Sequence, residues 1–567
     1  MKALKITIIA LLAGFSMASC DFLDKEPTKL TPENYFNTPA EANSFLTGVY
    51  PTFYGGDYMY LVAGDDLSHY GGSGRGPAST GLICNNATTS DNAVTAFWYA
   101  LYSGINRANM FLENIDKVTG FDSGVKEQYI AEARFLRAFY YFNLVECWGD
   151  VPFKTVSTQS VTNLNIPRTD KQEIYDFIVS EMADAAETGL KSAADLAYKP
   201  GRISQSTAWG ILARVYLFRA GEHYREDRNA TQAEKKDYFE RASFYAQKVM
   251  TAGHKLAANY WDPFIDMCSD KYNTTANESI WEAEFAGNNT SDTQAEGRIG
   301  NIIGLAGPDM SSKSDVVGSK DPGYAYAFIY STPKLYNLYV NNGDTKRFNW
   351  SIAPFEYKEA GGKNTGVTHR EFEQGKLAEV MSQYGQERGT YQYAGDTEKT
   401  TATKNYSRMC GKYRREYEAD KKDKNYTAIN FPILRYADVL LMIAEAENEA
   451  NDGPTALAYQ CLKEVRDRAG LSELSDMTQA EFRQTVKDER AMELCFEYTR
   501  RFDLIRWGEY VKNMRALVTE AQSGNNWTQG PTNVYTYFNI SSTYNYFPIP
   551  DAEMSVNKDI TQNNPGW

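Results

Sequence analysis

Apolar residues recur three and four positions apart in several long segments, which places them on one face of an amphipathic helix. The clearest segments are 130–147, 205–220 and 238–250. A glycine follows the end of each within three residues, as is common where a helix stops. The pattern therefore predicts three long helices in the first half of the chain.

The last third of the chain predicts a helical hairpin and a further helix. Segments 434–450 and 455–469 are separated by Asp452-Gly453-Pro454, and Gly470 follows the second. Thr478 and Glu481 have the spacing of a capping box, which opens a helix that we expect to run to about Thr499. Paired helices with small alanines at their crossings are typical of tetratricopeptide-like units, although the ~34-residue period of such repeats is absent.

Two stretches of a different character interrupt the helices. Segment 253–430 is rich in Gly, Asn, Ser, Thr, Tyr and Asp, and contains short strand-like pieces such as 279–285. Segment 54–95 is a smaller excursion with many glycines. Excursions longer than a connection requires are usually functional. We expect a mainly α fold: a tetratricopeptide-like scaffold of helical hairpins with long irregular loops and a few short strands.

This pattern divides the chain into parts of one composite domain that extends from 21 to 567. The first part of the scaffold is 46–252, the loop-rich ligand-binding excursion is 253–430, and the second part of the scaffold is 431–567. Segments 1–19 and 20–45 precede these parts.

The N-terminus has the pattern of a lipoprotein signal peptide over 1–19. Lys2 and Lys5 precede the apolar run 6–17, and Ala18-Ser19 precede Cys20. The run is shorter than the ~20 apolar residues that span a bilayer. We predict that Cys20 is acylated and that 20–45 is the lipidated tether and entry segment, the alternative being an ordinary secretory leader with a chance cysteine.

Charge and cysteine content narrow the functional classes. The 567-residue chain has a formal net charge of −14, which argues against binding to nucleic acid. The six cysteines after Cys20 form no CxxC pair, so their spacing suggests neither a zinc ribbon nor a thioredoxin-like site. We expect most of them to be reduced and buried, as small hydrophobic residues.

The sequence lacks the common catalytic motifs HExxH, GxSxG and GxxxxGK[ST]. Its four histidines are too scattered to suggest a metal cluster, and nothing indicates a cofactor. Asp65-Asp66 is the carboxylate pair to test first for glycoside hydrolysis, although adjacent residues seldom converge on one bond. We expect a protein that is not an enzyme.

Glu489, Glu493 and Glu497 lie four residues apart, so on a helix they form one acidic stripe. Arginines are abundant around and after them, beginning with Arg490. We interpret this stripe as one side of an ion-paired seam between helices, rather than as a catalytic site.

Aromatic residues make up 14% of the chain, and many tyrosines fall outside the helical stripes. Exposed rings beside polar groups suit sugars, whose C–H faces stack on an aromatic plane while their hydroxyls form hydrogen bonds. Any single tyrosine could instead pack a loop onto the scaffold. The set as a whole predicts an exposed aromatic platform.

Seven segments, in this order, resemble the SusD/RagB family of Bacteroidetes outer-membrane lipoproteins. They are CDFLD (20–24), WYALYSGINRAN (98–109), EARFLRA with WGDVP (132–138 and 148–152), WGILARVYL (209–217), RYADVLLMIAEA (435–446), VRDRAGL (465–471) and FPIP with QNNPG (547–550 and 562–566). Each segment alone is weak, but their order makes the resemblance specific.

The resemblance implies a non-enzymatic, lipid-anchored protein on the outer face of the outer membrane. Such a protein would capture an oligosaccharide or polysaccharide and act as the lid of a SusC-like TonB-dependent transporter. A peptide-binding lid of the RagB type, a surface glycoside hydrolase and a purely structural repeat scaffold remain alternatives.

Ligand residues vary within this family, so the candidate ligand-binding residues are chosen for their place in or beside the two excursions. They are Asp65, Asp66, Tyr70, Arg75, Trp98, Tyr324, Tyr326 and Tyr391. Trp98 opens a helical pattern, so it could instead belong to the core.

Overall fold

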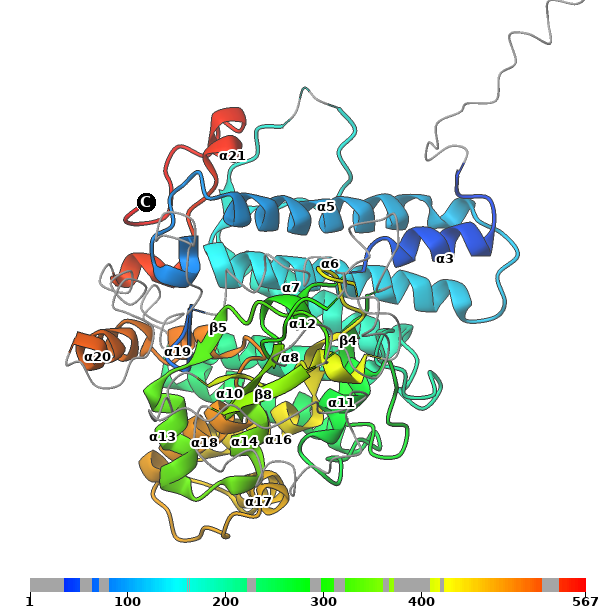
Figure 1. Ribbon diagram of the computed structural model, residues 1–567. Coiled ribbons are helices and arrows are strands. Elements are labelled where there is room, and N and C mark those ends of the chain that lie inside the picture. The colour runs from blue at the N-terminus through cyan, green and yellow to red at the C-terminus, as the bar shows by residue number, and fades with distance from the viewer. Residues whose placement is uncertain are drawn as a thin grey trace, which may run out of the picture.

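Helices dominate the described part of the chain, which confirms the expected fold class (Figure 1). This computed structural model describes residues 35–50, 64–70, 81–160, 162, 164–221, 231–285, 297–310, 322–359, 367–371, 408–418, 423–522 and 540–567. The helices are α3 (Pro39–Thr47), α5 (Asn92–Asn114), α6 (Val125–Trp148), α7 (Lys171–Thr188), α8 (Gln205–Ala220), α10 (Gln232–Met250), α11 (Asp262–Cys268), α12 (Ile299–Ile302), α13 (Pro333–Asn342), α14 (Thr345–Ser351), α16 (Tyr436–Ala450), α17 (Ala456–Ala469), α18 (Gln479–Leu494), α19 (Arg500–Arg506), α20 (Tyr510–Gln522) and α21 (Asp551–Val556).

The strands are short and pair in antiparallel fashion. They are β1 (Ser68–Tyr70), β2 (Val151–Pro152), β3 (Arg168–Thr169), β4 (Ser279–Ala283), β5 (Ile329–Ser331), β6 (Ile352–Ala353), β7 (Phe355–Glu359), β8 (Val367–Glu371), β9 (Met409–Cys410) and β10 (Phe431–Arg435). One sheet has the order β1-β5-β9-β6, and the other pairs are β10-β4, β2-β3 and β7-β8. The four-stranded sheet therefore joins the first loop excursion, which contains β1, to the second.

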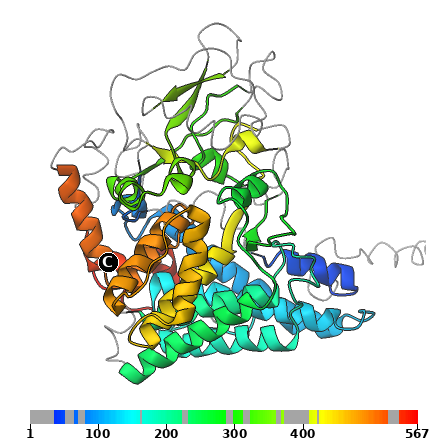
Figure 2. The same ribbon diagram turned by 90° about the horizontal axis from the view of Figure 1, so that it is seen from below.

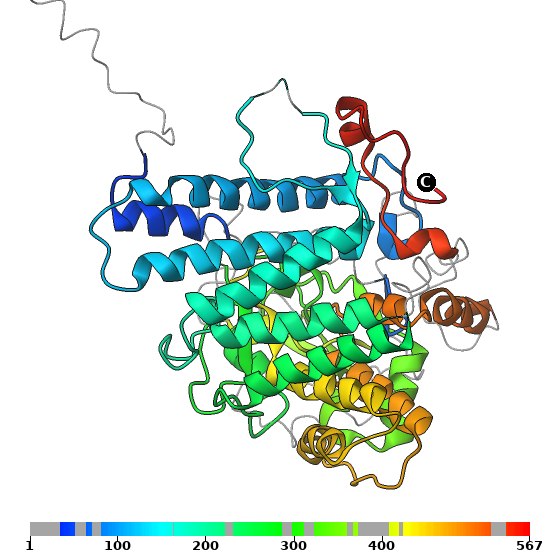
Figure 3. The ribbon, with the colours of Figure 1, turned by 180° about the vertical axis from the view of Figure 1, so that it is seen from behind.

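The scaffold is a succession of helices that each pack on the next. Contacts run from α5 to α6, α7, α8, α10 and α16, and α16 then packs against both α17 and α18. Seen from behind, these helices lie side by side (Figure 3). The segment from α11 to β9 gathers on the other side of the molecule (Figure 2). This is the arrangement of helical hairpins that the alanine-rich helix pairs predicted.

Local capping signals explain where the predicted helices begin and end. Thr478 and Glu481 form the expected capping box of α18, in which each side chain accepts a hydrogen bond from the other residue's backbone N–H. Gly470 ends α17 with a φ of 73°, a left-handed conformation that glycine adopts without steric cost. The helix predicted over 205–220 is present as α8 with the same bounds.

Several predicted boundaries were wrong. Helices α6 and α10 begin at Val125 and Gln232, before the predicted 130 and 238. Two other boundaries are set by tertiary contacts. The last helix does not reach Thr499, because Phe496 and Tyr498 both have a φ of 61°, which a right-handed helix cannot contain, and α18 ends at Leu494. Leu434 precedes α16 instead of opening it, because it pairs with Trp281 in the β10-β4 ladder. In both places, tertiary contacts override local helix propensity.

The second excursion also contains helices that the sequence analysis did not identify. Thr332 caps α13, Pro333 occupies its first position, and Gly343 ends it with a φ of 66°. These are ordinary start and stop signals, so α13 could have been found from them. The strand expected over 279–285 is present as β4.

The six cysteines after Cys20 are all free and buried, as expected from their irregular spacing. Within the described ranges, every helix is too short or too polar to cross a bilayer.

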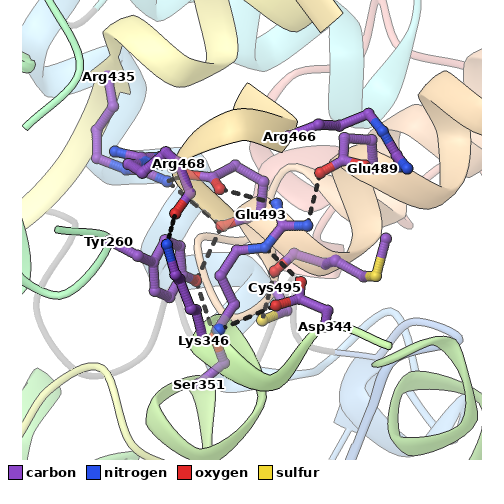
Figure 4. Close-up of polar contacts among 12 residues, drawn as sticks. Tyr260, Asp344, Lys346, Ser351, Arg435, Arg466, Arg468, Glu489, Glu493 and Cys495 are labelled. Carbon is purple, nitrogen blue, oxygen red and sulfur yellow. Dashed lines mark hydrogen bonds and ion pairs between the residues drawn. The ribbon is translucent and has the colours of Figure 1, made fainter. Parts of the chain in front are cut away.

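Glu489 and Glu493 of α18 form the predicted ion-paired seam together with Glu497, and we call it the Glu493 seam (Figure 4). The expectation that all three lie on one helical stripe was wrong, because α18 ends at Leu494, before Glu497. Glu493 lies 3.0 Å from Arg347 of α14, 3.2 Å from Arg435 of β10 and 2.5 Å from Arg468 of α17. The seam also contains pairs made by Asp344, Glu278, Glu489 with Arg466, and Glu497 with Lys412. Elements far apart in sequence thus meet on one helix face.

Burial makes the pairing within the seam obligatory. Burial alone would raise the pKa of Glu493, but Arg468, Arg435 and Arg347 outweigh it and hold that pKa well below its usual range. A buried pair of this kind is costly to break, because the remaining charge stays buried without compensation.

We predict that Glu493→Gln lowers the free energy of unfolding by about 3–5 kcal/mol, because three buried arginines lose one shared carboxylate. Urea unfolding followed by circular dichroism measures this change. Glu473→Gln is the matched control, since Glu473 is exposed and 4.0 Å from Lys463, and it should change stability by less than about 0.5 kcal/mol. Equal effects of the two substitutions would contradict the stabilising role of the seam.

A small cavity lies inside the scaffold, where α6, α8 and α19 meet. Its room of about 50 Å³ suits ~3–4 water molecules and is too small for a sugar ring. The charged groups that line it include Glu146, Arg214, Arg490, Asp503 and Arg506. The cavity therefore holds charge in the interior without being a candidate glycan site.

Glu146 is the remaining carboxyl group of this cavity. Arg214, Arg490 and Arg506 are already paired with the three carboxylates of Asp438, Asp503 and Glu445. Burial raises the pKa of Glu146 from 4.5 to about 8. The charges of Arg214 and Arg506 act against this shift, and the charge of Asp503 adds to it. The folded protein therefore keeps Glu146 protonated at neutral pH.

Glu146→Gln should make the stability of the protein less dependent on pH. Between about pH 4.5 and pH 8 the unfolded chain loses the Glu146 proton and the folded protein keeps it, so wild-type stability falls as pH rises. The variant lacks this loss. Its free energy of unfolding, relative to that of wild type, should therefore rise by up to about 1.4 kcal/mol for each pH unit and then level off. Urea unfolding at several pH values tests this, and parallel curves for the two proteins would show that Glu146 does not retain its proton on folding.

Candidate functional site

Aromatic rings of segment 322–328 form a ladder from the interior to the surface. The ring of Tyr70 lies 5.6 Å from that of Phe328, which stacks at 4.8 Å on Tyr326, and Tyr324 meets Tyr326 edge-on at 4.9 Å. Tyr70 is buried, whereas Tyr326 is 39% exposed and Tyr324 is partly exposed. We call Tyr324 and Tyr326 the tyrosine platform.

The backbone of the platform is tied to α12. The N–H of Tyr326 donates to the carbonyl of Asn301 at 2.8 Å, and the N–H of Phe328 donates to that of Ile302 at 2.8 Å. Ala327 between them has a φ of 49°, a left-handed conformation that is costly for a residue with a Cβ and is often retained at functional sites. The two rings are therefore held in place before any ligand binds.

Arg415 fixes the platform from beneath. Its guanidinium is buried, donates to the carbonyl of Tyr324 at 2.7 Å, and pairs with the carboxylate of Glu418 at 2.9 Å. It also donates to the carbonyls of Asp423 and Tyr426, at 2.8 Å and 2.9 Å. One side chain thus joins segment 322–328 to segment 423–426.

A lysine and an aspartate flank the rings. The Lys424 ammonium lies 5.3 Å from the centre of the Tyr324 ring and 2.8 Å from the Asp309 carboxylate. The hydrogen bond with Asp309 raises the pKa of Lys424, so the lysine stays charged. Aromatic rings next to a donor and an acceptor are what a polyhydroxylated ligand requires.

Asp65 and Asp66 do not contribute to an open site, because they are 4% and 0% exposed. Asp66 pairs with Lys334 and with Arg500, whose Nε lies 2.7 Å away. Arg500 and Lys334 outweigh burial and lower the pKa of Asp66, whereas burial and the charge of Asp66 raise the pKa of Asp65 to about 7. A glycosidic bond has no approach to this pair in the structure.

The other candidate residues divide into three groups. Trp98 is 1% exposed in α5 and packs against Trp148 at 5.2 Å, so it belongs to the core. Tyr70 is the buried foot of the ring ladder. Arg75, Tyr391 and Cys20 lie outside the described residues.

Four residues of the site were absent from the sequence prediction: Phe328, Lys424, Asp309 and Arg415. The alternation in Tyr324-Ala325-Tyr326-Ala327-Phe328 could have revealed Phe328, because alternate residues of an extended chain share one face. The other three come from distant segments and have no local signal. Within the described residues, no group of three or more histidine, cysteine, aspartate or glutamate side chains is arranged to hold a metal ion.

Comparison with known proteins identifies the family. The family model described as "SusD family" matches residues 277–567, which is more than half of the chain. The chain belongs to the SusD family. A second model, described as "Starch-binding associating with outer membrane", matches residues 21–217 of this SusD-family protein. The resemblance drawn from the seven sequence segments is thereby confirmed.

Relatives match over the whole length of this SusD-family protein. The SusD-like protein P2 of Formosa agariphila is 25% identical over all of both chains. A crystal structure of a SusD homologue from Bacteroides thetaiotaomicron has a TM-score of 0.78 and 26% identity, covering 96% of this chain and 100% of the other. Surface glycan-binding protein A of Bacteroides thetaiotaomicron, solved with laminarihexaose, has a TM-score of 0.65 and 20% identity, covering 93% and 100%.

Replacement of Arg415 should loosen the platform while leaving the scaffold intact. In Arg415→Met, segments 322–328 and 423–426 lose their common donor, so their amide hydrogens should exchange at least about tenfold faster. Hydrogen exchange with mass spectrometry measures this, and peptides from α6 to α8 should be unchanged. Lys424→Met is the matched control and should leave exchange in 322–328 near the wild-type rate; faster exchange in both variants alike would refute the role of Arg415.

Proposed function

We propose that this protein binds glycans at the tyrosine platform and delivers them to a SusC-like TonB-dependent transporter, for which it acts as a lid. The observation that carries the proposal is the exposed ring of Tyr326 and the partly exposed ring of Tyr324, held beside the Lys424–Asp309 pair. Rings of this kind offer stacking surface at little entropic cost, since their positions are fixed beforehand.

The family relationships support this function. A surface glycan-binding protein of the same fold was solved with laminarihexaose, and the model that matches residues 21–217 is described as starch-binding and associating with the outer membrane. We propose that acylated Cys20 anchors the chain to the outer face of that membrane. A lipid anchor leaves the folded domain free to move beside its partner.

The alternatives have less support. A peptide-binding lid predicts few exposed rings in the excursions, and the exposed ring of Tyr326 alone does not contradict it. We favour a glycan because a protein of the same fold was solved with laminarihexaose. A hydrolase needs two carboxylates that reach one glycosidic bond, and Asp65 and Asp66 are both buried. We therefore propose a glycan-binding protein that is not an enzyme.

Removal of the exposed ring of the platform should weaken glycan binding. In a soluble form that starts at Asp21, Tyr326→Ala should weaken binding by about fivefold or more, because a stacked ring contributes ~1 kcal/mol or more. Affinity electrophoresis against starch, laminarin, xyloglucan and other neutral polysaccharides tests this. Phe244→Ala is the matched control, because Phe244 is 54% exposed on α10, outside the platform.

The same panel separates the alternatives. Absence of binding to every polysaccharide would refute the glycan form of the proposal, and release of reducing sugar would indicate an enzyme. Equal binding by wild type and Tyr326→Ala would place the glycan site elsewhere.

A further inference from the structure

Charged side chains lie at the tyrosine platform and beneath it. The cations are Lys424, Arg415 and Arg298, and the carboxylates are Asp309, Glu418 and Asp423. These charges cancel one another, whereas the chain as a whole has a formal net charge of −14. The charge that a ligand meets on the platform therefore depends on which of these groups are exposed.

Two of the cations are engaged away from the rings of the platform. Arg415 is buried and forms a bidentate pair with Glu418, at 2.9 Å and 3.0 Å. Arg298 is half-buried, donates to the side chain of Asn301 at 3.0 Å and lies 5.8 Å from the centre of the Tyr426 ring. The third cation is therefore the one that a ligand on the rings meets first.

The Lys424–Asp309 pair is the exposed charge of the platform. The two side chains are 47% and 28% exposed, and their charged atoms lie 2.8 Å apart. The hydrogen bond with Asp309 is the main cause of the raised pKa of Lys424, and Tyr324 and Tyr326 add to the rise. Both rings are thus close to this ammonium group. The carboxylate of Asp423 accepts instead from backbone N–H groups of its own segment.

Backbone contacts hold the pair beside the rings. Gly307 and Ala325 form an antiparallel bridge, so the segment that leads to Asp309 runs alongside the platform. The carbonyl of Lys424 accepts from the side chain of Asn301 at 2.9 Å. The carbonyl of Asn301 in turn accepts from the backbone of the platform. The positive and the negative group therefore meet a ligand in a fixed arrangement.

The pair distinguishes neutral from acidic sugars. Ion pairs at exposed sites contribute little to folding stability, so the effect of this pair on a ligand is the larger one. Lys424 only donates hydrogen bonds and ionised Asp309 only accepts them, whereas a sugar hydroxyl does both. A carboxylate or a sulfate would have to approach Lys424 against the repulsion of Asp309, which already occupies the ammonium group.

We propose that Asp309 makes the glycan site selective for uncharged glycans and against those that carry uronates or sulfates. This inference rests on the proposed function, which places a glycan on the platform. Asp309 is then a specificity-determining residue, and the substrate class is neutral polysaccharides. The net charge of −14 acts in the same direction at longer range, so the experiment has to separate the two effects.

The probes are the neutral polysaccharides used to test Tyr326→Ala, together with two derivatives of each. A carboxymethyl derivative adds charge, and a hydroxyethyl derivative adds a group of similar size without charge. Isothermal titration calorimetry on the soluble form that starts at Asp21 measures each affinity. Wild type should bind the parent at least about fivefold more tightly than the carboxymethyl derivative, the effect of one charge at ~4 Å in water. It should bind the hydroxyethyl derivative as it binds the parent.

The ratio of the parent affinity to the carboxymethyl affinity tests the role of Asp309. Asp309→Asn should lower this ratio about fivefold, and Lys424→Glu should raise it about fivefold, whereas a folding defect would weaken all probes alike. Glu187→Gln is the matched control, because Glu187 of α7 pairs with Lys248 at 2.5 Å beside the ring of Trp209, outside the platform. It removes the same charge and should keep the wild-type ratio.

Four results would overturn the selectivity and leave glycan binding standing. They are an unchanged ratio in Asp309→Asn, an equal shift in Glu187→Gln, equal weakening by the carboxymethyl and hydroxyethyl groups, and a preference of wild type for the carboxymethyl derivative. The second result would assign the effect to net charge, and the third would assign it to size. Absence of binding to every probe would refute the proposed function, and the selectivity with it.

Discussion

The Glu493 seam is the interaction on which the rest of the structure depends. One carboxylate of α18 is shared by arginines from α14, β10 and α17, all of them buried. A buried carboxylate is stable only when its partners are in place. The interiors of the scaffold and of the second excursion therefore form together. The excursion is therefore an integral part of the fold, and a site carried on it has a rigid foundation.

The segment 408–418 connects this seam to the tyrosine platform. Lys412 donates to the carbonyl of Glu493 at 2.9 Å and pairs with Glu497 at 2.6 Å. Three residues later, Arg415 donates to the carbonyl of Tyr324. The segment that contributes to the seam through Lys412 thus also holds the backbone of Tyr324 through Arg415. Second-layer support of this kind keeps a binding surface preorganised.

The sequence predicts those helix ends that local signals determine. The capping box at Thr478 and the final glycine of α17 set helix ends that neighbouring residues alone could specify. The end of α18 could not be foreseen, because the turn at Phe496 and Tyr498 accompanies the long-range pairing of Glu497. In the site, the paired tyrosines were visible as a pattern, whereas the buried state of Asp66 depends on a partner 434 residues away, Arg500.

The stiffness of the body that carries the tyrosine platform bears on how the proposed lid would open. The platform rests on α12 and Arg415. Helices from α5 to α18 pack in succession, and the Glu493 seam joins that stack to the excursion. Opening within this body would expose buried charge, so a rotation of the whole body costs less free energy. The lid that we propose therefore moves as one piece, and the platform keeps its geometry from capture to delivery.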